Sequence, residues 1–228
     1  MPKLWTDDAD DTDGVDDQAA GDAQRTVTGR LQLADWRRRV ARLYAQVRAE
    51  EDPAAGHALW RAGRDELFRE HPQSPLLPDS ELFTTGLPYW PYDPRLRFEV
   101  PLLPTSEPLT LQVPTASDGL IPLRRIGQVQ LPAPLDASLD VWWLQQYAGG
   151  IFLPLRDGSS GRTSYGGGRY LLDTAKSADL GGSAETLVLD LNFLYHPSCR
   201  YNPAWECPLA QPGNTIGFDV QAGERLTA

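Results

Sequence analysis

The stretch LRRIGQVQLPAPLDASLDVWWLQQYAGGIFLPL, residues 123–155, decides the fold class. Its apolar residues fall into three short runs, at 123–131, 139–147 and 150–155. Pro and Asp separate the first two runs, and Gly149-Gly150 is typical of a two-residue hairpin turn between the second and the third. Trp142 and Trp143 offer one ring to each face of the middle run. This pattern predicts consecutive strands joined by hairpins.

The same pattern extends outward over the rest of the chain from Ser74. Proline recurs there so often that long helices are excluded. Further strands are predicted at 96–101, 108–113, 168–173, 186–195 and 215–220. We therefore expect a mainly β domain over residues 74–228, built as a partly closed β-barrel or a two-sheet sandwich.

An N-terminal pair of α-helices is predicted before this domain. Between residues 33 and 50, apolar residues including Trp36 and Tyr44 recur at helical spacing with arginines between them. A second helix begins at Asp52-Pro53, an N-cap followed by proline at the first helical position, and runs to about Glu70. Residues 28–73 are thus expected to form a helical segment packed on the main domain.

The acidity of the chain is concentrated at its N-terminus. Of the formal net charge of −10, most arises in the first 24 residues, which hold eight Asp and one Lys. Residues 1–27 are therefore predicted to be a disordered acidic tail. The remainder has no basic face, so nucleic acid is not an expected partner. With no apolar run of about 18 residues and no secretory signal, neither a membrane nor export is expected, and the cytoplasm is the default location.

A glycine-rich segment, Tyr-Gly-Gly-Gly-Arg-Tyr at residues 165–170, is a first candidate site. Glycines such as Gly167 allow a close approach of the backbone to a ligand, and Tyr165 lies beside them. Arg169 can add a bidentate contact to phosphate or carboxylate. The segment predicts either a cradle for a small anionic ligand or a tight turn at the start of a strand.

A second candidate lies on the predicted strand 186–195. Alternation places Leu189, Leu191 and similar residues on a core face, with Asp190 and Asn192 together on the other. A carboxylate beside an amide can bind a ligand or act as a general base, so Asp190 is a candidate catalytic residue. The alternative is a polar pair that hydrogen-bonds neighbouring backbone groups.

The segment 190–208 holds both cysteines and many polar side chains. Candidate ligand-binding residues there are Asn192, Tyr195, Arg200 and Asn202. Cys199 and Cys207 can be structural thiols in contact, a disulfide, or zinc ligands with His196. Alternatively, Cys199 is a catalytic nucleophile. A fourth zinc ligand is not evident, and no metal site is predicted. His57 and His71 are expected to be surface or capping residues.

Four motifs together resemble a bacterial and archaeal family known as domain of unknown function 1684. They are the helical segment from Trp60 to Phe68 followed by residues 71–75, and the segments 86–94, 165–170 and 190–208, to which Ala222-Gly223-Glu224 can be added. The resemblance covers about residues 35–226 and implies no activity, because the family is uncharacterised. The family pattern has Asn where this chain has His196, which counts against zinc binding and His-Cys catalysis.

We therefore expect an uncharacterised protein with a small-molecule pocket, for binding or for catalysis. The residues expected to form it are Tyr165, Arg169, Asp190, Asn192 and the Cys199–Cys207 loop. Its expected partner is a small anionic ligand, and the sequence identifies neither a cofactor nor an oligomeric state. The competing hypothesis is a structural or interaction scaffold, without catalytic activity, in which the same residues hold the domain together.

Overall fold

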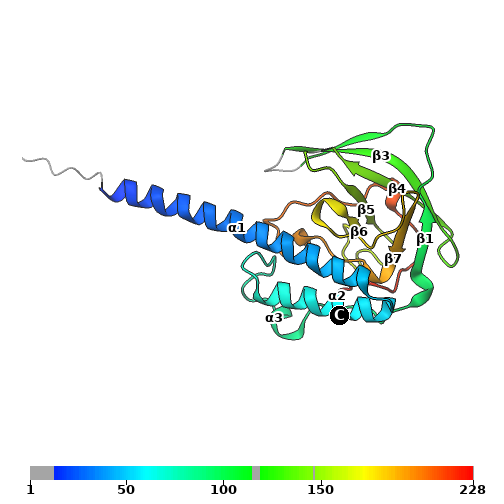
Figure 1. The fold of residues 1–228 in the computed structure, drawn as a ribbon, viewed down its shortest axis with the longest axis horizontal. Coiled ribbons are helices and arrows are strands. Elements are labelled where there is room, and N and C mark those ends of the chain that lie inside the picture. The colour runs from blue at the N-terminus through cyan, green and yellow to red at the C-terminus, as the bar shows by residue number, and fades with distance from the viewer. Residues whose placement is uncertain (1–12, 115–118, 146, 228) are drawn as a thin grey trace, which may run out of the picture.

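Seven strands form two antiparallel sheets in the computed structural model, which describes residues 13–114, 119–145 and 147–227 (Figure 1). The larger sheet contains, in hydrogen-bonded order, β2 (Thr110–Pro114), β3 (Leu120–Leu131), β4 (Ala137–Leu144), β5 (Ile151–Leu155) and β6 (Arg169–Asp173). The smaller sheet pairs β1 (Arg97–Pro101) with β7 (Thr186–Asp190). The mainly β class is therefore confirmed. In the larger sheet β2 and β6 are the edge strands, so the described strands form no closed barrel, and the expected partly closed barrel or two-sheet sandwich is supported only as far as two antiparallel sheets.

Two of the predicted strands are wrong in part or in whole. The strand expected at 186–195 ends at Asp190, because the Asp190 carboxylate accepts a hydrogen bond from the Asn192 backbone N–H at 3.0 Å and starts a 3-10 helix, η3 (Leu191–Phe193). The expected alternation of faces therefore fails, and Asp190 and Asn192 are both buried. Residues 215–220 form no strand in the described structure, and Thr215 makes a single bridge to Arg156.

Two long helices precede the sheets. The first, α1 (Asp13–Ala49), starts well before the predicted residue 33. Residues 13–27, predicted to be disordered, are thus helical, while residues 1–12 lie outside the described residues. Once a packed helix is nucleated, each added residue gains one hydrogen bond, so the helix extends beyond the part of it that packs on the fold. The second helix, α2 (Pro53–Glu70), begins as predicted, and its Asp52 cap accepts a hydrogen bond from Ala54 N at 3.0 Å.

Short helices complete the chain. They are α3 (Leu82–Thr85), η1 (Pro94–Leu96), η2 (Thr174–Lys176), η4 (Ser198–Arg200) and η5 (Pro212–Asn214).

The helix pair packs closely and lies against one side of the β domain (Figure 1). A Cβ atom at Gly63 would lie only 2.6 Å from Leu43 Cδ1, so glycine allows the close approach of α2 to α1. Trp60, which is fully buried, joins residues of both helices to Val188 and Phe193 of the β domain. A separate core fills the space around the sheets, with residues such as Leu153 and Leu189. The helix pair is therefore an integral layer of the fold.

His57 lies inside this helical layer, which corrects the expectation of a surface residue. Its side chain is 2% exposed and contacts the rings of Trp60, Tyr92 and Phe193. Its Nε2 atom has no hydrogen-bond partner among the described residues. Burial, together with the charge of Arg61, lowers the pKa of His57 from 6.5 to about 4.

The burial of neutral His57 predicts an acid-sensitive stability. Between pH 6.5 and about 4 the unfolded chain protonates this residue and the folded chain does not, so stability falls as the pH is lowered. We expect a loss on the order of 2 kcal/mol from this residue. Urea unfolding of the wild type and of His57→Phe across this range measures it. The wild type and the variant losing stability in parallel would contradict the prediction.

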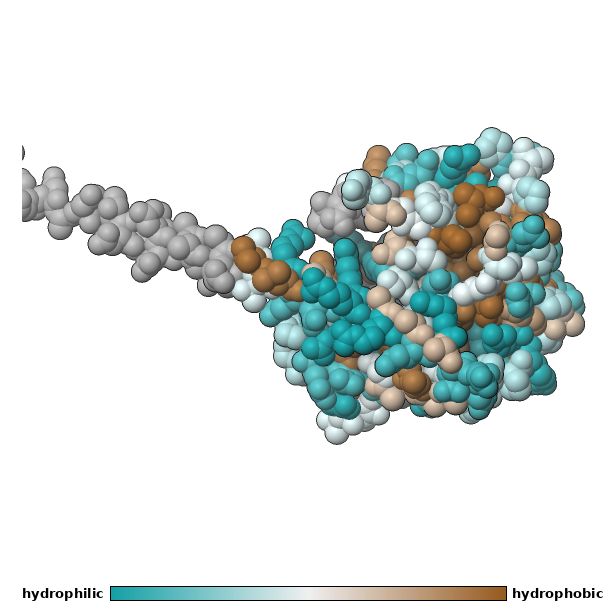
Figure 2. Space-filling model, in the orientation of Figure 1, coloured by the Kyte–Doolittle hydropathy of each residue, from teal (hydrophilic) through white to brown (hydrophobic). Residues whose placement is uncertain are grey.

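The described helices include none that is long and apolar enough to cross a membrane. Figure 2 shows a largely hydrophilic surface on the helical side with scattered apolar areas. Exposed apolar side chains of α1 include Val27, which is 53% exposed, and Leu31, which is 64% exposed. These two residues are four apart and so share one face of the helix.

Candidate functional site

A pocket of about 350 Å³ lies between the helix pair and the β domain. We call it the helix pocket. One wall comes from the helices, with Leu33, Trp36, Arg37, Val40, Leu43, Tyr44, Arg64, Leu67 and Phe68. The facing wall comes from the end of β6, from η2 and from the chain between 195 and 207, with Tyr170, Asp173, Lys176, Ala178, Tyr195, Trp205 and Cys207. Its volume falls within the usual range for small-molecule sites.

Asp173, the last residue of β6, is the buried acid of the helix pocket. It is 2% exposed, and its Oδ2 atom lies 3.2 Å from Nζ of Lys176. Its Oδ1 atom is buried and has no hydrogen-bond partner among the described residues. Burial raises the pKa of Tyr195 well above its usual range, and the charge of Asp173 adds to this effect. Burial likewise raises the pKa of Tyr44 to about 12, again with a contribution from Asp173.

Arg64, in the helical wall of the pocket, forms a buried ion pair with Glu224. The Arg64 guanidinium donates to Glu224 Oε2 at 2.9 Å and to the Tyr89 hydroxyl at 2.9 Å. It also lies over the Tyr195 ring at 4.9 Å. Glu224 is fully buried and also accepts hydrogen bonds from the Tyr201 hydroxyl and from the backbone N–H of residue 196. This pair connects α2 to the C-terminal segment.

His196 takes part in the same network and is not available as a base for Cys199. Its Nε2 atom accepts the Tyr165 backbone N–H at 3.2 Å, so the ring proton lies on Nδ1, 3.5 Å from Glu224 Oε1. No group of three or more His, Cys, Asp or Glu residues in the described part of the chain is arranged to hold a metal ion.

Cys199 and Cys207 are free thiols in contact with each other. Cys199 lies 4.0 Å from the Tyr165 hydroxyl, and Cys207 lines the helix pocket. A hydrogen bond from the Cys199 thiol lowers the pKa of Cys207, while the same contact, with burial, raises the pKa of Cys199. This arrangement matches the interpretation as structural thiols in contact. The predicted nucleophile, Cys199, thus has a raised thiol pKa and does not have His196 as a base.

Arg169 is not placed to bind an anionic ligand, contrary to the sequence prediction. Its side chain is 1% exposed and forms a buried ion pair with Asp157. Its nitrogens also donate to the carbonyl oxygens of Val220 at 3.0 Å, Ala222 at 2.5 Å and Glu224 at 2.9 Å. The guanidinium therefore joins the start of β6 to the C-terminal segment.

The glycine-rich segment forms the alternative that the sequence offered, a tight turn at the start of a strand. Gly168 has a φ of +88°, and its N–H donates to Tyr165 O at 2.9 Å. A Cβ atom at Gly168 would lie 2.8 Å from Leu155 O, and one at Gly167 would lie 2.6 Å from the Tyr165 ring. These glycines are required by close packing within the chain, and none of them lines the helix pocket.

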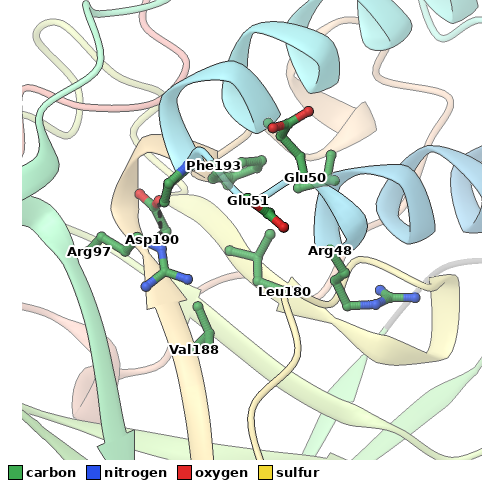
Figure 3. A pocket seen from close by; sticks show the side chains of 11 residues that line it. Arg48, Glu50, Glu51, Arg97, Leu180, Val188, Asp190 and Phe193 are labelled. Atoms are coloured by element: carbon green, nitrogen blue, oxygen red, sulfur yellow. Dashed lines mark ion pairs between the residues drawn. The ribbon is translucent and has the colours of Figure 1, made fainter.

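Asp190 and Asn192 do not line the helix pocket either. Asp190 Oδ1 accepts from Asn192 Nδ2 at 2.7 Å, and the Asn192 amide also makes two hydrogen bonds to the backbone of Asp93. Asp190 borders a small cavity of about 90 Å³, where it faces Arg97 at 3.8 Å (Figure 3). Burial raises the pKa of Asp190. That volume suits a few water molecules and is too small for an ordinary ligand.

The remaining predicted residues are divided between the helix pocket and the surface loop. Tyr195 lines the helix pocket, as predicted for a ligand-binding residue. Arg200 lies 6.0 Å from the Tyr201 ring, and Asn202 caps a turn by accepting the Ala204 N–H at 2.9 Å. Of the predicted set, Tyr195 and Cys207 line the helix pocket, Tyr165 and Cys199 lie together next to Cys207, and Asp190 and Asn192 hydrogen-bond each other at another place. The sequence reasoning did not identify Asp173 and Arg64 as pocket residues. The helical spacing of Trp36 and its apolar neighbours did identify the face of α1 that points toward the fold.

These features define a class of protein: a β-rich domain of two open antiparallel sheets, covered by a helix pair with a pocket between them. The chain belongs to the family described as "Protein of unknown function (DUF1684)", whose model matches residues 83–225. The expected resemblance is therefore confirmed, although the matched range begins after the helical wall of the pocket.

Among solved structures, the following one is similar to this chain over most of the length of both proteins. It is the solution NMR structure of an uncharacterised protein of Haloarcula marismortui, with 30% sequence identity and a TM-score of 0.53. The similarity covers 73% of this chain and 90% of that chain. No curated protein matches this chain.

Proposed function

We propose that the protein binds a small apolar anion in the helix pocket. The observation that carries this proposal is a pocket of about 350 Å³ whose walls are mostly apolar and aromatic. Trp36, Phe68 and Trp205 provide large rings, and a few polar groups interrupt them. Ligand pockets commonly combine such apolar walls with a small number of fixed polar groups. Binding rather than catalysis is proposed, because His196, which borders the pocket, already accepts the Tyr165 backbone N–H through Nε2.

The pocket lining holds the cations Arg30, Arg37, Arg64 and Lys176 against the acids Asp173 and Glu206, so its net charge favours an anion. Arg30 and Arg37 lie on the exposed side of α1 at the pocket, and neither has an ion-pair partner among the described residues. Lys176 lies at the facing wall, paired with Asp173. A carboxylate or sulfonate at the rim gains attraction from these cations, while its apolar part removes the aromatic walls from water. The proposal thus retains the anionic ligand expected from the sequence. Arg37 takes the anion-binding role that the sequence analysis assigned to Arg169.

Binding of decanoate tests the proposal. We expect wild-type protein to bind decanoate with a change in tryptophan fluorescence, because Trp36 and Trp205 line the pocket. Reversing the charge in Arg37→Glu is expected to weaken binding about fivefold, as befits a solvent-exposed ion pair. Isothermal titration calorimetry at low salt measures both affinities.

The adjacent residue offers a matched control. Arg38 is exposed on the same helix and does not line the pocket, so Arg38→Glu makes the same change in net charge without the contact. Its decanoate affinity should stay close to that of the wild type. Equal weakening by the two substitutions, or absence of binding to the wild type at millimolar decanoate, would refute the proposal.

A second candidate function is an interaction scaffold. It is favoured by the position of Arg169, Asp190 and Asn192, whose polar groups are bound within the protein itself. The N-terminal part of α1 also extends away from the rest of the fold (Figure 1), and Val27 and Leu31 are exposed on it. If the wild-type protein is stably folded and yet binds no small anion, the interaction scaffold is the function that remains.

A further inference from the structure

The two cysteines enclose a loop that forms part of the helix pocket. Cys207 lines the pocket together with Trp205, and Ser198, which precedes Cys199, lines it as well. We call residues 200–206 the thiol loop. Both cysteines are free, and both are only partly buried. A cysteine that serves packing alone is usually fully buried, whereas a partly exposed pair is accessible to small reagents.

The two thiols are in contact, as the partners of a disulfide must be. The Cys199 thiol donates a hydrogen bond to the Cys207 sulfur, and the Cys199 backbone N–H donates to the same sulfur. These hydrogen bonds lower the pKa of Cys207, which increases the fraction of thiolate, the form that attacks a disulfide. Bond formation requires the two sulfurs to approach from this contact to about 2 Å.

The hydrogen bonds that shape the thiol loop are local. The Asn202 N–H donates to Ser198 O at 3.2 Å, and the Trp205 N–H donates to Asn202 O at 3.1 Å. The Asn202 side chain accepts the Ala204 N–H at 2.9 Å. These bonds hold one turn to the next and do not themselves join Trp205 to the body of the fold. A covalent link at Cys207 ties the end of the loop, and the pocket wall that it carries, to η4.

We propose that Cys199 and Cys207 form a reversible disulfide that regulates the helix pocket, and that the oxidised form binds the anion more tightly. The regulation rests on the proposed function, whereas the formation of the disulfide does not. In the reduced protein a ligand has to order the thiol loop and Trp205 when it binds. In the oxidised protein the covalent link has already ordered them, so binding no longer carries this cost.

The chemistry is thiol–disulfide exchange with a small organic disulfide as the oxidant. One thiolate of the pair attacks a sulfur of the oxidant, which forms a mixed disulfide and releases one small thiol. The other thiolate then attacks the protein sulfur of the mixed disulfide, releases the second small thiol and forms the Cys199–Cys207 bond. The protein thereby loses two electrons and two protons, and the oxidant is reduced to two thiols. An excess of the small thiol reverses both steps.

Thiol trapping on the full chain tests the disulfide itself. Wild-type protein is equilibrated with mixtures of 2-hydroxyethyl disulfide and 2-mercaptoethanol, and the remaining thiols are blocked with iodoacetamide. The chain holds only two cysteines, so the intact mass reports both. We expect doubly alkylated chains to give way to chains with no alkyl group and no added mercaptoethanol as the disulfide content rises. Chains that stay doubly alkylated, or that accumulate only mixed disulfides, would overturn the proposal.

Hydrogen exchange of the thiol loop measures the effect of the bond without any ligand. The amides of residues 200–206 are expected to exchange about fivefold more slowly in the oxidised protein, because the link restricts opening of the loop. The matched control is the double variant Cys199→Ser/Cys207→Ser, whose exchange should be the same with and without the oxidant. Equal exchange in the two redox states of the wild type would contradict the ordering of the loop.

Decanoate affinity in the two redox states tests the regulation. Calorimetry is expected to show about threefold tighter binding to the oxidised wild type, and no response of the double variant to the oxidant. If the disulfide forms and the oxidised protein binds decanoate equally or more weakly, the regulation is wrong while the anion pocket stands. If neither redox state binds decanoate, the proposed function fails and the regulation fails with it, whereas the disulfide is decided by thiol trapping alone.

Discussion

Replacing Arg169 by methionine is expected to lower the free energy of unfolding by about 3–5 kcal/mol, as removal of one partner from a buried ion pair does. The substitution leaves the carboxylate of Asp157, whose side chain is fully buried, without a counter-charge. It also leaves the carbonyls of Val220, Ala222 and Glu224 without donors from the guanidinium. Urea unfolding followed by circular dichroism measures the change.

An exposed arginine provides the control. Arg162 pairs with Asp219 at 2.7 Å, and the two side chains are 64% and 47% exposed. Arg162→Met should therefore change the stability by less than about 1 kcal/mol. An unchanged unfolding midpoint in Arg169→Met would contradict the structural role of Arg169. Because Arg169 does not line the helix pocket, a folded Arg169→Met protein should still bind decanoate. Loss of that binding would instead support the ligand-binding role that the sequence predicted for Arg169.

Replacing Glu224 by glutamine is expected to cost about 3 kcal/mol, because it removes the buried negative charge that faces Arg64. The glutamine amide keeps the shape of the side chain. It has one acceptor oxygen, however, for donor groups that in the wild type are shared between two carboxylate oxygens. Those groups are Arg64, the Tyr201 hydroxyl and the backbone N–H of residue 196. Thermal and urea unfolding measure the loss, and the matched control is Asp219→Asn in the exposed pair.

The pH dependence gives this substitution a second readout. Burial alone would raise the pKa of Glu224, but the interactions with His196, including its hydrogen bonds, and the charge of Arg64 bring it below its ordinary value of 4.5. The charged form therefore stabilises the folded state above pH 4.5, and this contribution is lost as the pH falls through the lower folded-state pKa. The wild type and Glu224→Gln should thus converge in stability toward acid pH. A constant difference between them would show that the charge of Glu224 is not responsible.

Local rules were sufficient for the elements whose signals lie within a few residues. The runs around Val129, Val141 and Leu153 became β3, β4 and β5, because hairpin-connected strands pair with their sequence neighbours. The start of α2 at Asp52-Pro53 followed from capping alone. By contrast, the end of β7 depended on a single side chain, since Asp190 turned the backbone where the apolar alternation continued.

The candidate site shows the same division more strongly. Density of polar residues in the segment 190–208 identified Tyr195 and Cys207 as pocket residues, but the same criterion also selected Asn192 and Asn202, which hydrogen-bond nearby backbone. A polar side chain that binds a ligand and one that satisfies a buried backbone group are alike in sequence. They differ only in whether a partner within the protein reaches them.

The sequence by itself determined the family, the mainly β class, the helix pair and the hairpin-connected strands, because these follow from local periodicity, capping and turn residues. Only the tertiary structure decided that Arg169 meets Asp157, that Glu224 meets Arg64, and that α1 closes a pocket over Asp173. The physical reason is that these contacts join residues far apart in the chain. Each depends on how two layers pack, and no local pattern of residues records that packing.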